Sequence, residues 1–172
     1  IQSTLTNFKY VSAMWKNNCE EERLLGVSLT GIMDNELTNG KSGDTAKLLD
    51  ELREEAVKTN KEYANKIGIP VAAAITCVKP SGTVSQLVDA ASGIHARHNP
   101  FYIRTVRGDK KDPLTKMMVD AGFPVEDDVM NPNHTSVFSF PMKVHKSAVF
   151  RTDMSAIEQL ELWLTYQKHW CE

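Results

Sequence analysis

An apolar run over residues 71–78 ends in the turn Pro80-Ser81-Gly82-Thr83. Both faces of the run are apolar, which is typical of a parallel strand that is covered on both sides. Pro80 disfavours helical backbone at the residue before it, and Ser81 and Thr83 are residue types favoured at helix starts. We therefore expect the strand to lead through this turn into a short helix over residues 84–90.

The same turn is a candidate ligand site. A strand that ends in such a turn points several backbone N–H groups outward at a helix start, and this arrangement binds phosphate. The hydroxyls of Ser81 and Thr83 would add donors to the site. The alternative is an ordinary strand-to-helix connection that needs Pro and Gly only for its shape. The turn is not a P-loop, because the Gly-Lys-Ser/Thr ending of that motif is absent.

Strands and helices alternate along the rest of the chain. Apolar periodicity and capping residues predict further strands over residues 25–33, 101–107 and 136–144, and helices over residues 3–24, 45–66, 113–121 and 155–171. The acidic residues 126–128 are expected to form a solvated loop. This alternation predicts an α/β fold with a largely parallel sheet or barrel.

Composition sets the class of protein. The chain has 172 residues, 41% of them hydrophobic and 24% charged, which suits a globular domain with a real core. A formal net charge of −2 does not mark a nucleic-acid or membrane-surface binder. The 3 cysteines include no C-x-x-C pair, so we expect neither a zinc site nor a disulfide framework but a reducing, cytoplasmic setting. The chain begins without Met and ends inside an expected helix, so we expect it to be a segment of a longer protein.

A second cluster, rich in His, Arg and aromatic residues, follows the turn over residues 91–107. Its arginines would bind phosphate or carboxylate, and its aromatic rings would pack against a planar ligand. The alternative is a loop and a half-buried strand whose arginines face solvent. His95 and His98 have a spacing that fits a metal pair on a helix, but Gly93 and Pro100 disfavour a helix, so no metal site is expected.

Several segments together resemble one family. Residues 79–87, 93–97 and 102–107 resemble the C-terminal part of the catalytic domain of adenosylcobalamin-dependent (class II) ribonucleotide reductases, especially the monomeric type that reduces ribonucleoside triphosphates. The flanking residues 25–32, 111–114 and 158–163 are similar to that family too. The resemblance covers nearly the whole chain. It implies that residues 1–172 are a single segment of a ten-stranded α/β barrel.

The resemblance also implies a reaction and its participants. These enzymes replace the ribose 2′-hydroxyl by hydrogen, with a thiyl radical generated through adenosylcobalamin and electrons from cysteines that thioredoxin or another dithiol reduces again. The residues that would hold the substrate phosphates are Ser81, Gly82, Thr83 and Val84. Those that would lie near the active site or the cofactor are His95, Arg97 and Arg104.

The chain departs from the family at its cysteines. The radical-bearing cysteine belongs to an Asn-Pro-Cys-x-Glu type of motif, which does not occur here, and the reducing C-terminal cysteine pair is absent too. Cys19 imitates the motif, but its acidic neighbours disfavour a thiolate, so we expect it to be non-catalytic. No catalytic residue is therefore assigned, and the isolated segment should need a complementary N-terminal half. The alternative function is a non-catalytic nucleotide-binding or structural α/β domain.

Overall fold

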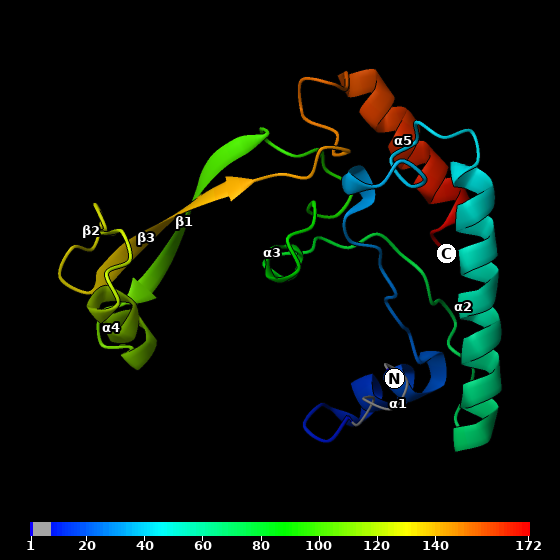
Figure 1. Ribbon diagram of the computed structural model, residues 1–172. Helices are drawn as coiled ribbons and strands as arrows, with labels where there is room; N and C mark the ends of the chain where they lie inside the picture. The colour runs from blue at the N-terminus through cyan, green and yellow to red at the C-terminus, as the bar shows by residue number, and fades with distance from the viewer. Residues whose placement is uncertain (2–7) are drawn as a thin grey trace. The chain divides into compact units, whose positions relative to one another are not determined.

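The computed structural model describes residue 1 and residues 8–172, which form two compact units. The first unit comprises residues 1–97 and 147–172, and the second comprises residues 98–146 (Figure 1). The expected helix over residues 3–24 lies partly outside the described residues, and within them α1 spans Ala13–Glu22.

The first unit is built around two helices that pack against each other, α2 (Thr45–Ile67) and α5 (Ala156–His169) (Figure 1). Both confirm the predictions. α2 ends at Gly68, whose φ of 72° is left-handed, and α5 begins with a complete capping box between Ser155 and Glu158. These two helices and the short 3-10 helix η2 (Ile32–Asp34) enclose the core of the unit. The buried residues of this core are Ile32, Met33, Leu49, Ala91, Ile94, Val149, Leu162, Tyr166 and Trp170.

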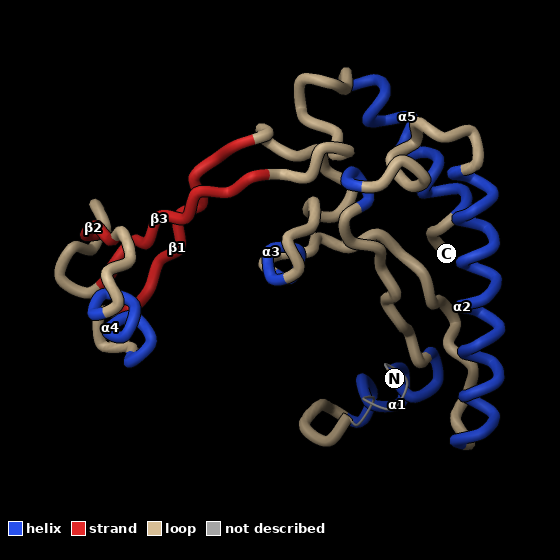
Figure 2. Tube along the Cα trace, viewed as in Figure 1, coloured by secondary structure: helices blue, strands red, loops and turns tan. Residues whose placement is uncertain are grey.

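The expected strands 25–33 and 71–78 run side by side but do not form regular strands. Figure 2 draws residues 25–31 and 71–78 as loop, whereas residues 32 and 33 belong to η2. They meet in a single parallel bridge between Val27 and Thr76. Val27 N donates to Ile75 O at 2.8 Å, and Cys77 N donates to Val27 O at 3.0 Å. The parallel direction was therefore predicted correctly, whereas the strand lengths were wrong. Gly31 takes a left-handed φ of 78° and turns the chain into η2, which ends the extended segment early.

The second unit is an antiparallel sheet of order β1-β3-β2 with one helix. β1 (Phe101–Asp109) pairs along its whole length with β3 (Thr135–Lys143), and β2 (Val125–Asp127) pairs with β3 from the other side. The helix α4 (Pro113–Asp120) begins at Asp112, whose side chain accepts a hydrogen bond from Leu114 N. β1, α4 and β3 confirm the predicted elements.

Two expectations are corrected in this unit. The sheet is antiparallel, so parallel pairing among the described residues is confined to the bridges Val27–Thr76 and Arg97–Phe150. Part of the acidic run belongs to β2, because β3 offers it a free edge to pair with. Asp128 is buried rather than solvated, with 6% of its surface exposed.

Among the described residues, none of the helices has the length and apolar character needed to cross a membrane.

Candidate functional site

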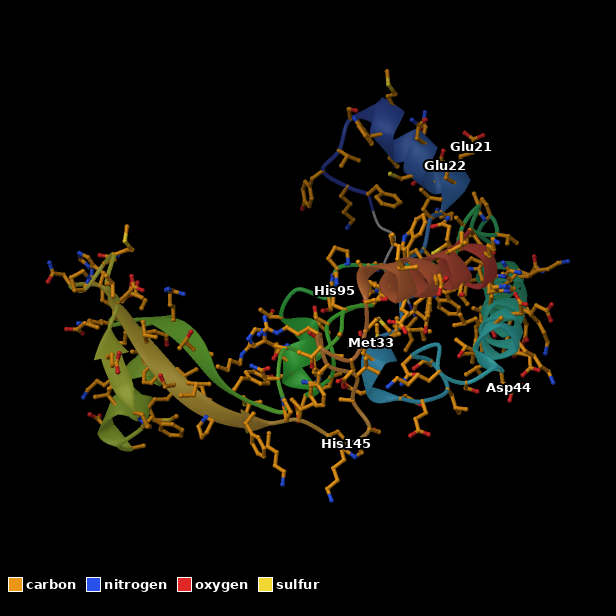
Figure 3. The ribbon with its side chains drawn as sticks, turned by 90° about the horizontal axis from the view of Figure 1, so that it is seen from above. Glu21, Glu22, Met33, Asp44, His95 and His145 are labelled. Carbon is orange, nitrogen blue, oxygen red and sulfur yellow. The ribbon has the colours of Figure 1, made fainter. Side chains whose placement is uncertain are left out.

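A cavity of about 370 Å³ lies at the Pro-Ser-Gly-Thr turn in the first unit. The turn leads into the four-residue helix α3 (Val84–Leu87), and the loop after α3 forms the facing wall. His95 is labelled on that loop in Figure 3. His95 and the residues of the turn therefore line the same cavity. The lining residues are Val78, Lys79, Pro80, Ser81, Gly82, Ser92, Gly93, Ile94 and His95.

Gly93 lets the two walls approach each other, and Gly82 allows the left-handed backbone of the turn. Gly82 and Gly93 have left-handed φ values of 55° and 51°, and a Cβ on Gly93 would lie 3.3 Å from Lys79 O. Within the described part of the chain, the backbone N–H groups of Gly82 and Thr83 donate to no acceptor. Val84 N, in contrast, donates to Ser81 O at 3.1 Å. The turn thus presents two free N–H donors, as a phosphate site requires.

The capping prediction is only partly right. Thr83 occupies the N-cap position of α3, but its side chain makes no capping hydrogen bond. Its hydroxyl is exposed and remains available to a ligand. Ser81 is not the cap; its hydroxyl bonds to two other serines instead.

Ser81 is the centre of a cluster of three hydroxyls. Ser81 Oγ donates to Ser85 Oγ at 2.9 Å and lies 2.7 Å from Ser92 Oγ. Ser85 is completely buried. The cluster holds the turn, α3 and the facing wall together. Sequence reasoning missed Ser85 and Ser92 as site residues: Ser85 follows Ser81 by one helical turn, which was a usable signal, but Ser92 carried none.

The cavity favours an anion. Lys79 is exposed at its rim, and its side chain passes over Gly26, where a Cβ would collide with Lys79 Cε. His95 adds a second nitrogen-bearing side chain. The described residues that line the cavity include no carboxylate. Free N–H groups, hydroxyls and an ammonium group together suit phosphate.

The structure does not bring the two predicted arginines into this cavity. Arg97 is 6% exposed and is turned away from it, into an ion pair with Asp34. Arg104 lies in β1 of the second unit and is half-buried. Within the described residues it has neither an ion pair nor a side-chain hydrogen bond.

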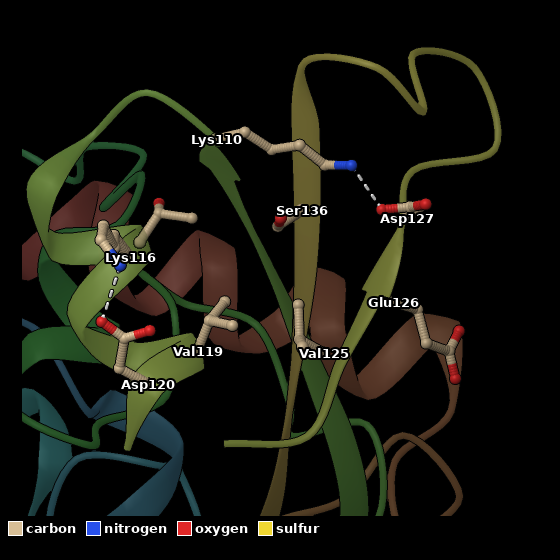
Figure 4. A pocket seen from close by; sticks show the side chains of 9 residues that line it. Lys110, Lys116, Val119, Asp120, Val125, Glu126, Asp127 and Ser136 are labelled. Carbon is tan, nitrogen blue, oxygen red and sulfur yellow. Dashed lines mark hydrogen bonds and ion pairs between the residues drawn. The ribbon is translucent and has the colours of Figure 1, made fainter. Parts of the chain in front are cut away.

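A larger cavity, of about 510 Å³, lies in the second unit between α4 and β2 (Figure 4). Its lysines are already paired: Lys110 Nζ lies 2.6 Å from Asp127 Oδ1, and Lys116 Nζ lies 2.9 Å from Asp120 Oδ2. Glu126 adds a further carboxylate. Because no positive charge is left over, this cavity is the weaker candidate for an anionic ligand despite its size.

Comparison with known proteins points to one class. No protein-family model matches the chain. The chain is similar to a solved structure described as a B-12 dependent (class II) ribonucleotide reductase, with a TM-score of 0.82, 24% identity, and coverage of 98% of this chain and 27% of the other. This match confirms the expected α/β fold of the class II ribonucleotide reductase type, of which the chain forms a part.

Curated relatives name that class more narrowly. The chain is 32% identical over 156 residues to a probable adenosylcobalamin-dependent ribonucleoside-triphosphate reductase of Dictyostelium discoideum, covering 87% of this chain and 20% of the relative. It is 27% identical over 161 residues to the adenosylcobalamin-dependent ribonucleoside-triphosphate reductase of Euglena gracilis, covering 92% and 22%. A Lactobacillus delbrueckii reductase of the same name is 28% identical over 148 residues, covering 72% and 20%.

These relatives confirm the resemblance inferred from the sequence. Over most of its length the chain is homologous to adenosylcobalamin-dependent ribonucleoside-triphosphate reductases. It spans about a fifth of the length of the curated relatives it matches.

Proposed function

We propose that this chain is part of an adenosylcobalamin-dependent ribonucleoside-triphosphate reductase, in which it supplies the substrate-phosphate site and part of the barrel wall. Both units would belong to one barrel segment over residues 1–172. The phosphate site would consist of Ser81, Gly82, Thr83 and Val84. The single observation that carries this proposal is the cavity at the turn, with Lys79 at its rim and the free N–H group of Gly82 in its lining; the second free N–H group belongs to the next residue, Thr83, which like Val84 adjoins the cavity in sequence but does not line it.

Each residue of the turn has a distinct task in this proposal. Gly82 and Thr83 donate their backbone N–H groups to phosphate oxygens, and the exposed Thr83 hydroxyl adds a third donor. Ser81 holds the turn in shape through its two hydroxyl partners, and Val84 begins α3 behind it. Lys79 neutralises part of the phosphate charge. The substrate class, a ribonucleoside triphosphate, is taken from the names of the relatives.

The described residues do not form a complete cobalamin site. A cavity of about 370 Å³ holds a phosphate chain but not a corrin, and its donors are those of an anion site. In the whole enzyme the cofactor would supply the radical that starts the reaction. His95 and Arg104 are proposed to lie near the active site or the cofactor, and no step is assigned to them here.

Chemical reduction would depend on residues outside the matched motifs. The chain lacks the Asn-Pro-Cys-x-Glu motif, and we propose that Cys19, Cys77 and Cys171 are not the radical site. A complementary N-terminal half and thioredoxin, or another dithiol, would complete the enzyme. Its product would supply deoxyribonucleotides for DNA replication in the cytoplasm.

A reduction assay tests the proposal. The polypeptide as its gene encodes it is mixed with adenosylcobalamin, a ribonucleoside triphosphate and a dithiol, and deoxynucleotide is measured. Loss of the Thr83 donor in Thr83→Ala should raise KM about tenfold or more, since a hydrogen bond to a charged group contributes about 1.5–3 kcal/mol. Thr59→Ala is the matched control, because Thr59 is also an exposed threonine and lies on α2.

Three outcomes would count against the proposal. An unchanged KM in Thr83→Ala would remove the turn from the phosphate site. Nucleotide binding without any product from the encoded polypeptide would favour the second candidate, a non-catalytic nucleotide-binding domain. Robust reduction by the isolated residues 1–172 would contradict the assignment of the three cysteines as non-catalytic.

A further inference from the structure

Behind the cavity wall, one partly buried carboxylate, with 18% of its side chain exposed, holds both ends of a short loop. We infer that the ion pair between Asp34 and Arg97 positions residues 92–95, which form one wall of the cavity, and so sets the affinity of the turn for phosphate. This inference rests on the proposed function of the turn. It gives Arg97 the task of a positioning residue, since its side chain does not line the cavity.

The contacts form a two-pronged clamp. Arg97 Nε lies 2.9 Å from Asp34 Oδ1, and Arg97 Nη2 lies 2.9 Å from Asp34 Oδ2. Asp34 Oδ2 also accepts a hydrogen bond from Ala91 N at 2.6 Å. Arg97 Nη2 in turn donates to Asp89 O at 2.6 Å. One carboxylate therefore ties together the residues on both sides of the 92–95 wall.

The clamp is itself anchored in the core. Asp34 closes η2, whose other residues, Ile32 and Met33, are completely buried. Its backbone carbonyl accepts a hydrogen bond from Ser147 Oγ at 2.8 Å. At the other end, Arg97 N donates to Val149 O at 2.8 Å. A bidentate ion pair with only 6% of the arginine side chain exposed has one well-defined geometry, and it therefore fixes the position of residues 92–95.

The wall matters because the Ser81 hydroxyl bonds across to it. Ser92 Oγ lies 2.7 Å from Ser81 Oγ, and Gly93 packs against the carbonyl of Lys79. If the loop loosens, Ser92 withdraws from Ser81, and the turn loses the partner that holds its donors in place. The effect expected from breaking the pair is weaker nucleotide binding with little change in the chemical step.

Hydrogen exchange and nucleotide titration test the inference on Asp34→Asn and Arg97→Lys in the polypeptide as its gene encodes it. The amides of residues 91–95 should exchange at least tenfold faster, while those of α2 keep their wild-type rates. The KM for a ribonucleoside triphosphate should rise at least fivefold, with kcat within twofold of wild type. Tyr166→Phe is the control: it removes another part-buried hydrogen bond of the same unit, from Tyr166 Oη to Thr38 O, and should leave exchange at 91–95 unchanged.

The outcomes separate this inference from the proposed function. If Thr83→Ala weakens nucleotide binding but Asp34→Asn and Arg97→Lys do not, the positioning role is wrong and the phosphate site stands. If the 91–95 amides exchange faster in both clamp variants while Thr83→Ala binds normally, the clamp is real and the proposed ligand is wrong. If amide exchange in α2 is accelerated over wild type as much as at residues 91–95 in both variants, the ion pair only supports the core and the inference is overturned.

Discussion

Replacing Ser81 by alanine should destabilise the first unit, whereas replacing Thr83 should not. The Ser81 hydroxyl bonds to Ser85 and Ser92 at 2.9 and 2.7 Å, and Ser85 is completely buried. Removing it deletes two neutral hydrogen bonds and leaves the buried Ser85 oxygen with only the long 3.5 Å hydrogen bond from Gln86 Nε2, which costs about 1–3 kcal/mol. Thr83 is exposed and makes no capping bond, so Thr83→Ala should change stability by about 0.5 kcal/mol or less.

Urea unfolding followed by tryptophan fluorescence measures this difference. All 3 tryptophans (Trp15, Trp163 and Trp170) belong to the first unit, so their signal reports on the unit that contains the turn. Ser81→Ala should unfold at lower urea concentration with an unchanged slope, and Thr83→Ala at the wild-type midpoint. Equal midpoints for the two variants would refute the reasoning, because the Ser81 hydroxyl would then contribute no more to the stability of the first unit than the Thr83 side chain does.

Three further predictions concern the scaffold of the two units. Leu49→Ala should lower the free energy of unfolding, measured with urea, by about 2–5 kcal/mol, because Leu49 is completely buried. Leu52 is 40% exposed on the same helix, so Leu52→Ala should lower it by about 1 kcal/mol or less. Ser155→Ala removes the capping box of α5 and should cost about 1 kcal/mol, measured the same way. The hydrogen bond from Arg107 holds the pKa of Asp128 below its ordinary value of 3.8. The ionised Asp128 therefore contributes its full stabilisation of the folded unit above pH 3.8, and this stabilisation is lost as the pH falls through the lowered pKa. NMR of the second unit should show this acid transition in the wild type and not in Asp128→Asn.

Elements with strong local signals were predictable from the sequence. α2 has a long apolar stripe and a terminal Gly68, and α5 has both halves of a capping box, so each carries its own boundaries. β1 and β3 alternate in a way that needs little context. The turn at Ser81 was predictable as a turn, because Pro80 and Gly82 favour it locally, and its role as a phosphate site stays a prediction.

Features set by distant partners were not predictable. The apolar run 71–78 stays extended but makes one bridge, because a regular parallel strand requires a continuous ladder with a neighbour, and Val27 supplies only one bridged position. The strand at Val125–Asp127 exists because β3 pairs with it, although its own residues are acidic. Ser92 became a site residue through a contact with Ser81 that no local pattern encodes.

The three arginines of the second cluster show most clearly what sequence position leaves undecided. Arg97, Arg104 and Arg107 looked equivalent as ligand-binding candidates, but their partners divide them. Arg97 is bound by a carboxylate 63 residues away in sequence, and Arg107 Nε lies 2.8 Å from the buried carboxylate of Asp128. Both guanidinium groups already have an anion. Arg104 has no such partner among the described residues, so of the three it is the one whose charge is left for a ligand. A carboxylate within hydrogen-bond distance, rather than nearness to the turn in the sequence, separates the two arginines with structural ion pairs from Arg104, which remains a candidate for ligand binding.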